Sequence, residues 1–114
     1  MSSGRVLVVE DNEAIRESLT EVLRTAGYRA DSATKGDDAV RKFAKGDVVL
    51  LVLDVGLDFS GLKLLEALPK KPPVILMSGQ PERRRNSGTP VFLSKPFPPV
   101  RLLEEVERQL GSPN

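Results

Sequence analysis

The sequence predicts an α/β fold built on a doubly wound, five-stranded parallel sheet. Short apolar runs alternate along the chain with segments whose apolar residues recur at the 3.6-residue spacing of a helix. The run Val48 to Leu53 is aliphatic without interruption, which is typical of a strand buried on both faces of a parallel sheet. Strands that alternate with helices in this way indicate a doubly wound α/β sheet.

The first half of the chain predicts two strands and two helices. Arg5–Val9 is short, β-branched and apolar, which favours a strand. The helix expected after it has one apolar face, formed by Ala14, Ile15, Leu19, Val22, Leu23 and Ala26. Asp11 or Asn12 can cap the start of this helix, and Gly27 ends it. A weak second strand and a short second helix are then expected at Tyr28–Ala33 and Asp37–Ala44.

The second half predicts three strands and two helices. The third strand is Val48–Asp54, and a leucine-rich third helix is expected at Gly61–Leu68 before several prolines break it. The fourth and fifth strands are expected at Val74–Met77 and Val91–Leu93. Pro98 and Pro99 suit the first turn of a last helix. Its buried stripe would consist of Val100, Leu102, Leu103, Val106 and Leu110.

Composition limits the function classes. The 114 residues fit a single domain, residues 1–114. The chain has no cysteine and no histidine, which excludes disulfides, thiol chemistry and Cys/His zinc sites, so a bound metal would need oxygen ligands. A net charge of +1 gives no bulk attraction to nucleic acid or membranes. Because no apolar run suits a signal peptide or a membrane span, we expect a cytoplasmic protein.

Four of the expected strands lead directly into residues suited to phosphoryl chemistry. Glu10 and Asp11 follow the first strand, and Asp54 ends the third. Ser78 follows the fourth, and Lys95 lies just beyond the fifth. Doubly wound sheets bind ligands beyond the carboxyl ends of their strands. The acids could bind a divalent cation, the lysine and the serine could contact a phosphoryl group, and Asp54 could act as a nucleophile.

Each of these residues also has an ordinary structural interpretation. Asp11 could simply cap the first helix while Glu10 lies in solvent. Asp54 and Ser78 could be turn residues, and Lys95 could be a solvated lysine. The functional interpretation is favoured because suitable side chains occur in order after four strands of one predicted sheet.

The motifs around these residues resemble the receiver domain of two-component response regulators, from about residue 4 to residue 110. The resemblance is carried by Val-Leu-Val-Val-Glu-Asp-Asn-Glu at 6–13, Leu-Asp at 53–54, Ile-Leu-Met-Ser-Gly at 75–79 and Phe-Leu-Ser-Lys-Pro-Phe at 92–97. It implies a flavodoxin-like fold with strand order 2-1-3-4-5. It also implies Mg²⁺-dependent phosphotransfer, with Mn²⁺ as a possible substitute, from a phosphohistidine on a partner kinase.

The resemblance assigns roles by position. Asp54 would be the phosphoacceptor, and Lys95 would pair with the phosphoryl group. Asp11 would bind the metal directly, Glu10 would bind it through water, and the backbone carbonyl of Gly56 would be a further ligand. Two more positions would take part in switching, namely Ser78, which would reach for the phosphoryl group, and Phe92, the rotating aromatic. Phe92 could equally be an ordinary core aromatic.

Two features depart from the family pattern. Asp58 stands four residues after Asp54, where relatives usually have proline, and this loop is about one residue shorter than in relatives. Both differences weaken the assignment of the Gly56 carbonyl as a metal ligand. The segment 78–90 contains no aliphatic or aromatic residue, so we expect the family's fourth helix to be absent, mobile or reduced to one turn at Glu82–Arg85. Arg83, Arg84 and Arg85 could meet an acidic partner or nucleic acid, although a solvated loop is favoured.

Three functions are therefore compared. The favoured one is a phosphoacceptor module that receives a phosphoryl group from a histidine kinase or phosphotransfer protein and signals to an unknown protein target, without binding nucleic acid or membrane. Such a module would catalyse only its own phosphorylation and dephosphorylation. The alternative is a degenerate receiver that binds a partner without phosphorylation. A magnesium phosphatase is disfavoured because the first strand is not followed by Asp-x-Asp, and a P-loop is absent.

Overall fold

The computed structural model describes residues 4–54, 72–78 and 91–111. Within them five parallel strands form one sheet in the order β2-β1-β3-β4-β5. The elements along the chain are β1 Arg5–Val9, α1 Glu13–Thr25, β2 Arg29–Ala33, α2 Gly36–Ala44, β3 Val48–Asp54, β4 Val74–Ser78, β5 Val91–Ser94 and α4 Pro99–Leu110. The predicted fold class and strand order are confirmed.

Every predicted element that falls on described residues is present, with small shifts at its ends. Tyr28 precedes β2 instead of opening it, and β4 and β5 each run one residue further than expected, to Ser78 and Ser94. The helix expected at 61–68, the loop around Asp58 and the shortened helix expected at 79–90 lie outside the described residues, so these predictions stand untested.

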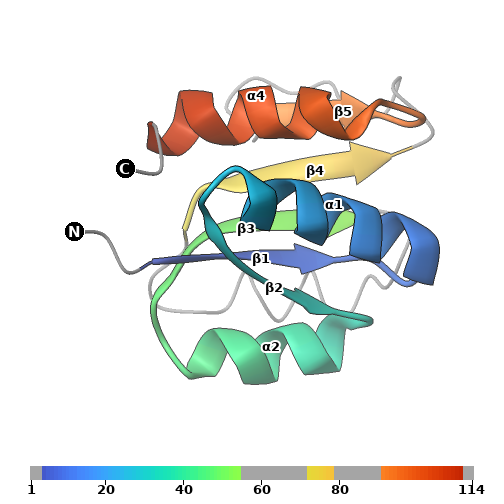
Figure 1. Cartoon of the computed structure of the whole chain (residues 1–114). Coiled ribbons are helices and arrows are strands. Elements are labelled where there is room, and N and C mark those ends of the chain that lie inside the picture. The colour runs from blue at the N-terminus through green and yellow to red at the C-terminus, as the bar shows by residue number, and fades with distance from the viewer. Residues whose placement is uncertain (1–3, 55–71, 79–90, 112–114) are drawn as a thin grey trace.

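The helices cover the sheet in two layers, with α1 and α4 on one face and α2 on the other (Figure 1). Side chains alternate between the faces along β1 and β3. Leu50 and Val52 of β3 pack in the core beneath α1 and α4, whereas Leu51 and Leu53 pack in the core beneath α2. The uninterrupted aliphatic run of β3 is thus explained, because both of its faces are buried.

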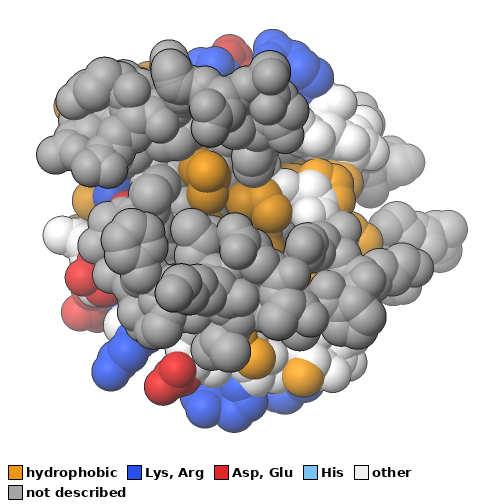
Figure 2. Space-filling model, turned by 180° about the vertical axis from the view of Figure 1, so that it is seen from behind, with side chains coloured by type: hydrophobic (Ala, Val, Ile, Leu, Met, Phe, Trp, Pro, Cys, Tyr) orange, Lys and Arg blue, Asp and Glu red, His pale blue; other side chains and the backbone are white. Residues whose placement is uncertain are grey.

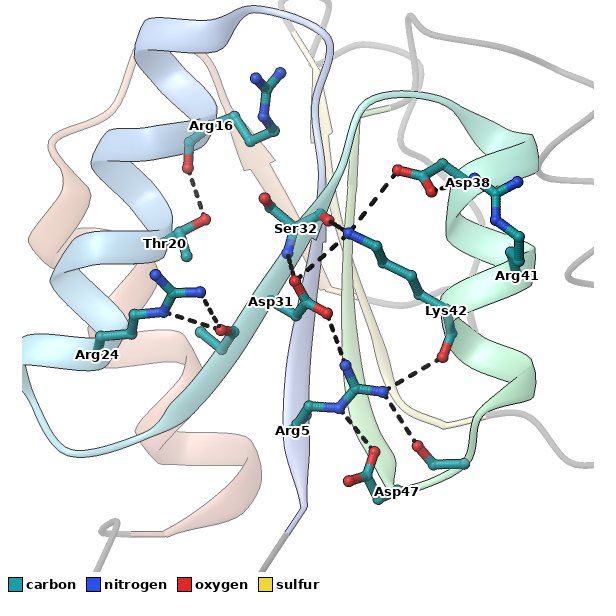
Figure 3. A network of polar contacts seen from close by, with 12 residues as sticks. Arg5, Arg16, Thr20, Arg24, Asp31, Ser32, Asp38, Arg41, Lys42 and Asp47 are labelled. Carbon is teal, nitrogen blue, oxygen red and sulfur yellow. Dashed lines mark hydrogen bonds and ion pairs between the residues drawn. The ribbon is translucent and has the colours of Figure 1, made fainter.

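A polar network closes the edge of the sheet where the strands begin (Figure 3). Arg5 donates from Nε to Asp47 and from Nη1 to Asp31, each over 2.8 Å. Its Nη2 also donates to the carbonyls of Lys42 and Gly46, at the end of α2. The chain turns there through positive φ angles of 92° at Gly46 and 63° at Asp47. One arginine therefore joins β1 to β2 and to the α2–β3 turn, a role that the sequence did not reveal.

Seen from behind, the charged side chains lie toward the periphery of the view and the hydrophobic ones lie further in (Figure 2). None of the helices in the described ranges is long and apolar enough to cross a membrane.

Candidate functional site at the carboxyl ends of the strands

The three predicted acids converge. Glu10 directly follows β1, Asp11 is the next residue, and Asp54 is the last residue of the adjacent strand β3. One carboxylate oxygen from each of these residues lies within 4.8 Å of the others. Because parallel strands end at the same edge of a sheet, two segments more than forty residues apart in the chain meet here.

Glu10 is buried, with 1% of its surface exposed. Its Oε1 accepts a hydrogen bond from Lys95 Nζ over 2.9 Å, and its Oε2 accepts one from the Asn12 backbone N–H over 3.1 Å. Burial raises the pKa of Glu10, and the Asp54 charge adds to this effect, while the bonds from Lys95 and Asn12 oppose it. The alternative in which Glu10 is a solvated residue is wrong.

Lys95 reaches two of the acids from β5, the strand at one edge of the sheet. It lies just after β5, and its Nζ donates to Asp54 Oδ2 over 3.2 Å as well as to Glu10. Burial alone would lower the pKa of Lys95, but the bond to Glu10 and the charge of Asp54 outweigh it and raise this pKa overall. The amine is therefore an ammonium ion at neutral pH. The peptide bond between Lys95 and Pro96 is cis.

The turn between β1 and α1 is held by residues on both sides of Asp11. Asn12 is the N-cap of α1, and its Oδ1 accepts a hydrogen bond from the Ile15 N–H over 2.9 Å. Arg16 Nη1 donates to the Glu10 carbonyl over 3.1 Å. The N-cap is therefore Asn12, and the alternative in which Asp11 caps the helix is wrong; Asp11 itself is exposed. The carboxylate of Asp11 is left facing the site and the solvent.

Arg16 is a site-supporting residue that sequence reasoning missed. It lies one helical turn after Asn12, on α1, and it fixes the backbone of the turn that carries Glu10 and Asp11. An arginine one turn into a helix that follows paired acids was the available signal. That signal is weak, because most surface arginines simply extend into solvent.

The donor set suits a hard divalent cation. Three carboxylates offer oxygen ligands within a small space, and the chain has no histidine or cysteine to recruit a softer metal. Asp11 and Asp54 are the carboxylates with solvent access, whereas the Glu10 carboxylate is enclosed. The residues present therefore fit Mg²⁺.

The remaining predicted site residues are located only in part. Ser78 is the last residue of β4 and pairs with Ser94, and Phe92 lies in β5 opposite Leu76. The side chains of Ser78 and Phe92 and the whole of Gly56 lie outside what the structure describes. Their roles stay predictions.

An apolar groove of about 380 Å³ adjoins the site between α1 and the loop that joins β5 to α4. Ile15 and Leu19 of α1 form one wall, and Lys95, Pro96 and Phe97 form the other. Ile15 and Val100 are the large hydrophobic residues exposed in the described part of the chain, and Ile15 lines this groove. Lys95 thus borders on an apolar surface.

Comparison with known proteins identifies the family. The family model described as the response regulator receiver domain matches residues 6–107. The chain is a response regulator receiver domain. The receiver domain is 33% identical to the transcriptional regulatory protein HprR of Escherichia coli (strain K12), over 93% of the chain and 51% of HprR. It is 36% identical to protein Rrf1 of Nitratidesulfovibrio vulgaris, over 96% of the chain and 84% of Rrf1.

Solved structures of similar receivers share the fold. The chemotaxis response regulator CheY4 of Vibrio cholerae superposes with a TM-score of 0.83 at 28% identity, covering 96% of this chain and 100% of that one. The response regulator TrrA of Thermotoga maritima, solved in complex with Mg²⁺–BeF, has a TM-score of 0.80 at 29% identity, covering 95% and 100%. The receiver domain spans about half the length of HprR and of other regulatory proteins that it matches.

Proposed function

We propose that this receiver domain accepts a phosphoryl group on Asp54 in a Mg²⁺-dependent reaction, and that the phosphorylated form signals by protein contact. The observation that carries the proposal is the contact of Lys95 Nζ with Asp54 Oδ2, inside a cluster of three carboxylates. A receiver that is not phosphorylated does not require these three carboxylates and Lys95 to lie together. The alternative of a phosphorylation-independent binding module is therefore not favoured.

Asp54 is suited to act as the nucleophile. A carboxylate oxygen of Asp54 attacks the phosphorus of the donor, so that a P–O bond forms while the P–N bond of the donor phosphohistidine breaks. The electron pair of the broken bond stays on the imidazole nitrogen of the donor. Bound Mg²⁺ would supply positive charge to the phosphoryl oxygens, with Asp11 and Asp54 as the accessible ligands and Glu10 behind them.

Lys95 supplies the second positive charge. Its ammonium already lies 3.2 Å from Asp54 Oδ2, so a phosphoryl group on Asp54 would be within its reach. The transferred group carries its negative charge on oxygens that the lysine can pair with as a point charge. Ser78, at the end of β4, and the carbonyl of Gly56 are proposed to complete the contacts, and Phe92 to follow the switch.

The phosphodonor is proposed to be a histidine kinase or a phosphotransfer protein. Receiver domains of response regulators receive phosphoryl groups from histidine kinases. The apolar groove beside Lys95, with Ile15 at its edge, offers contact area to a donor domain that must bring its histidine to Asp54. We propose a cytoplasmic site of action, no contact with nucleic acid or membrane, and no reaction beyond self-phosphorylation and self-dephosphorylation.

Intact-mass measurement tests the proposal. The protein is incubated with Mg²⁺ and a small acyl phosphate, and wild type is compared with Asp54→Asn and with Asp37→Asn, which changes an exposed acid in α2. We expect wild type and Asp37→Asn to gain the mass of one phosphoryl group, and Asp54→Asn to gain none. Removal of Mg²⁺ with a chelator should abolish the gain. An unmodified wild type, or a modified Asp54→Asn, would overturn the proposal.

A further inference from the structure

Every polar group of Glu10 is engaged within the described part of the chain. Its backbone N–H donates to the Ala33 carbonyl over 3.1 Å, and its own carbonyl accepts from Arg16. Its two carboxylate oxygens accept from Asn12 N–H and from Lys95 Nζ. With 1% of its surface exposed and its polar groups bonded, the Glu10 side chain is held in one position.

Asp11 is the opposite case, although it is the next residue in the chain. It is exposed, and within the described ranges no hydrogen bond or ion pair involves its carboxylate. The two adjacent acids thus differ in kind. Asp11 has a carboxylate that can turn to an incoming cation, whereas the carboxylate of Glu10 is already committed to an ammonium ion.

The backbone of Lys95 lies at an edge strand of the sheet, far from the acids that its side chain contacts. It follows β5 at one edge of the sheet, and β4 and β3 lie between β5 and β1 (Figure 1). Its flexible four-carbon stem must therefore extend past the end of β4 to reach Asp54 at the end of β3. Glu10, which directly follows β1 and so lies beyond Asp54, contacts the Lys95 Nζ at 2.9 Å, a shorter distance than the 3.2 Å to Asp54.

We propose that Glu10 is a positioning residue, whose buried carboxylate holds the Lys95 ammonium beside Asp54 whether or not a metal is bound. This inference rests on the proposed function, because positioning of Lys95 matters only if Asp54 receives a phosphoryl group. It assigns to Glu10 a task distinct from water-mediated metal binding. During transfer, Lys95 keeps its bond to Glu10 and exchanges the Asp54 oxygen for a phosphoryl oxygen.

Two substitutions separate positioning from metal binding. Glu10→Gln keeps the length of the side chain and removes its charge. Glu10→Asp keeps the charge but is one methylene shorter, so it can still hold a metal-bound water while falling short of Lys95. If Glu10 serves the metal alone, Glu10→Asp should resemble wild type. If Glu10 positions Lys95, both variants should be slow.

The first measurement is the rate of phosphorylation by a small acyl phosphate, at Mg²⁺ concentrations that calorimetry shows to saturate each variant. We expect Glu10→Gln and Glu10→Asp to be slower by about 10-fold to 100-fold, as for other small misplacements of a catalytic group. Lys95→Met should be at least as slow, and Glu10→Gln added to Lys95→Met should cause no further loss. Restoration of the Glu10→Gln rate by saturating Mg²⁺, or a multiplicative double variant, would overturn the inference.

The second measurement uses the metal-free protein and does not depend on activity. The ammonium group of Lys95, assigned in ¹⁵N NMR spectra by its loss in Lys95→Met, should give a distinct slowly exchanging signal in wild type. This signal should disappear in Glu10→Gln and in Glu10→Asp, while melting curves confirm that both variants are folded. Its persistence in both variants would refute the positioning role. A wild type that is never phosphorylated would instead refute the proposed function, with the NMR result still reporting on the contact.

Discussion

Arg5 Nη1 lies 2.8 Å from Asp31 Oδ2, so an ion pair ties the first residue of β1 to the middle of β2 (Figure 3). Lys42 of α2 approaches the same carboxylate, with its Nζ 3.6 Å from Oδ1. A half-buried acid inside a strand is thus flanked by two cations from different elements. This explains why β2, which is polar at Asp31 and Ser32 and weakly predicted as a strand, still forms.

Acid should weaken this part of the fold through Asp31. Burial alone would raise the pKa of Asp31, but the Ser32 N–H bond and the charges of Lys42 and Arg5 lower it below its ordinary value of 3.8. The unfolded chain therefore takes up the proton first, and the stability that Asp31 contributes is present above pH 3.8 and lost as the pH falls through the lowered value. We expect Asp31→Asn to be less stable than wild type at pH 7, with a difference that shrinks below about pH 3.8.

Urea unfolding at pH 7 and at pH 3 measures both differences. Glu21→Gln is the matched control, because Glu21 is an exposed acid on α1 that forms no ion pair with the other described residues. It should change the urea midpoint little at either pH. If Asp31→Asn stays equally far below wild type at both pH values, the carboxylate charge is not what stabilises β2.

The cap of α1 should contribute to stability without governing metal binding. Asn12→Ala removes the hydrogen bond that Asn12 Oδ1 accepts from the Ile15 N–H, but it keeps the Asn12 backbone N–H that donates to Glu10 Oε2. We expect a loss of about 1 kcal/mol in the free energy of unfolding, as for other caps. The rise in melting temperature on adding Mg²⁺ should be close to that of wild type. A large loss of the Mg²⁺ effect would mean that the Asn12 side chain also orders the acids.

The sequence predicted those parts of the fold and site that depend on backbone pattern. The aliphatic run of β3 indicated burial on both faces, and the positions of Glu10, Asp54 and Lys95 at strand ends indicated convergence. The missed contacts are made by long side chains. Arg5 reaches carbonyls and acids that are distant in sequence, and Arg16 reaches back from α1 to the Glu10 carbonyl. Nothing in the sequence pattern distinguishes these two residues from solvated arginines.

The core under α1 and α4 should be sensitive to truncation. Leu50 of β3 is fully buried there, with 0% of its surface exposed. Leu50→Ala removes buried methyl groups and leaves a cavity, so we expect a loss of about 2–5 kcal/mol in the free energy of unfolding. Val100→Ala, at a residue that is 53% exposed on α4, is the control and should change stability by less than about 0.5 kcal/mol. Equal losses in the two variants would contradict the described packing.

Asp11 should govern the response of the fold to Mg²⁺. Three carboxylates within 4.8 Å repel one another when no metal is present, so Asp11→Asn should leave the metal-free protein as stable as wild type or slightly more stable. Mg²⁺ that binds only the folded state stabilises wild type by ~2.7 kcal/mol at a hundred times its Kd, and the exposed Asp11 carboxylate is the ligand most able to turn to the ion. Melting curves with and without Mg²⁺ should therefore show a much smaller rise for Asp11→Asn than for wild type. Asp37→Asn, an exposed acid in the first turn of α2, should keep the full rise. A full rise in Asp11→Asn would mean that Asp54 and Glu10 hold the ion without it, and that the exposure of Asp11 has no bearing on metal binding.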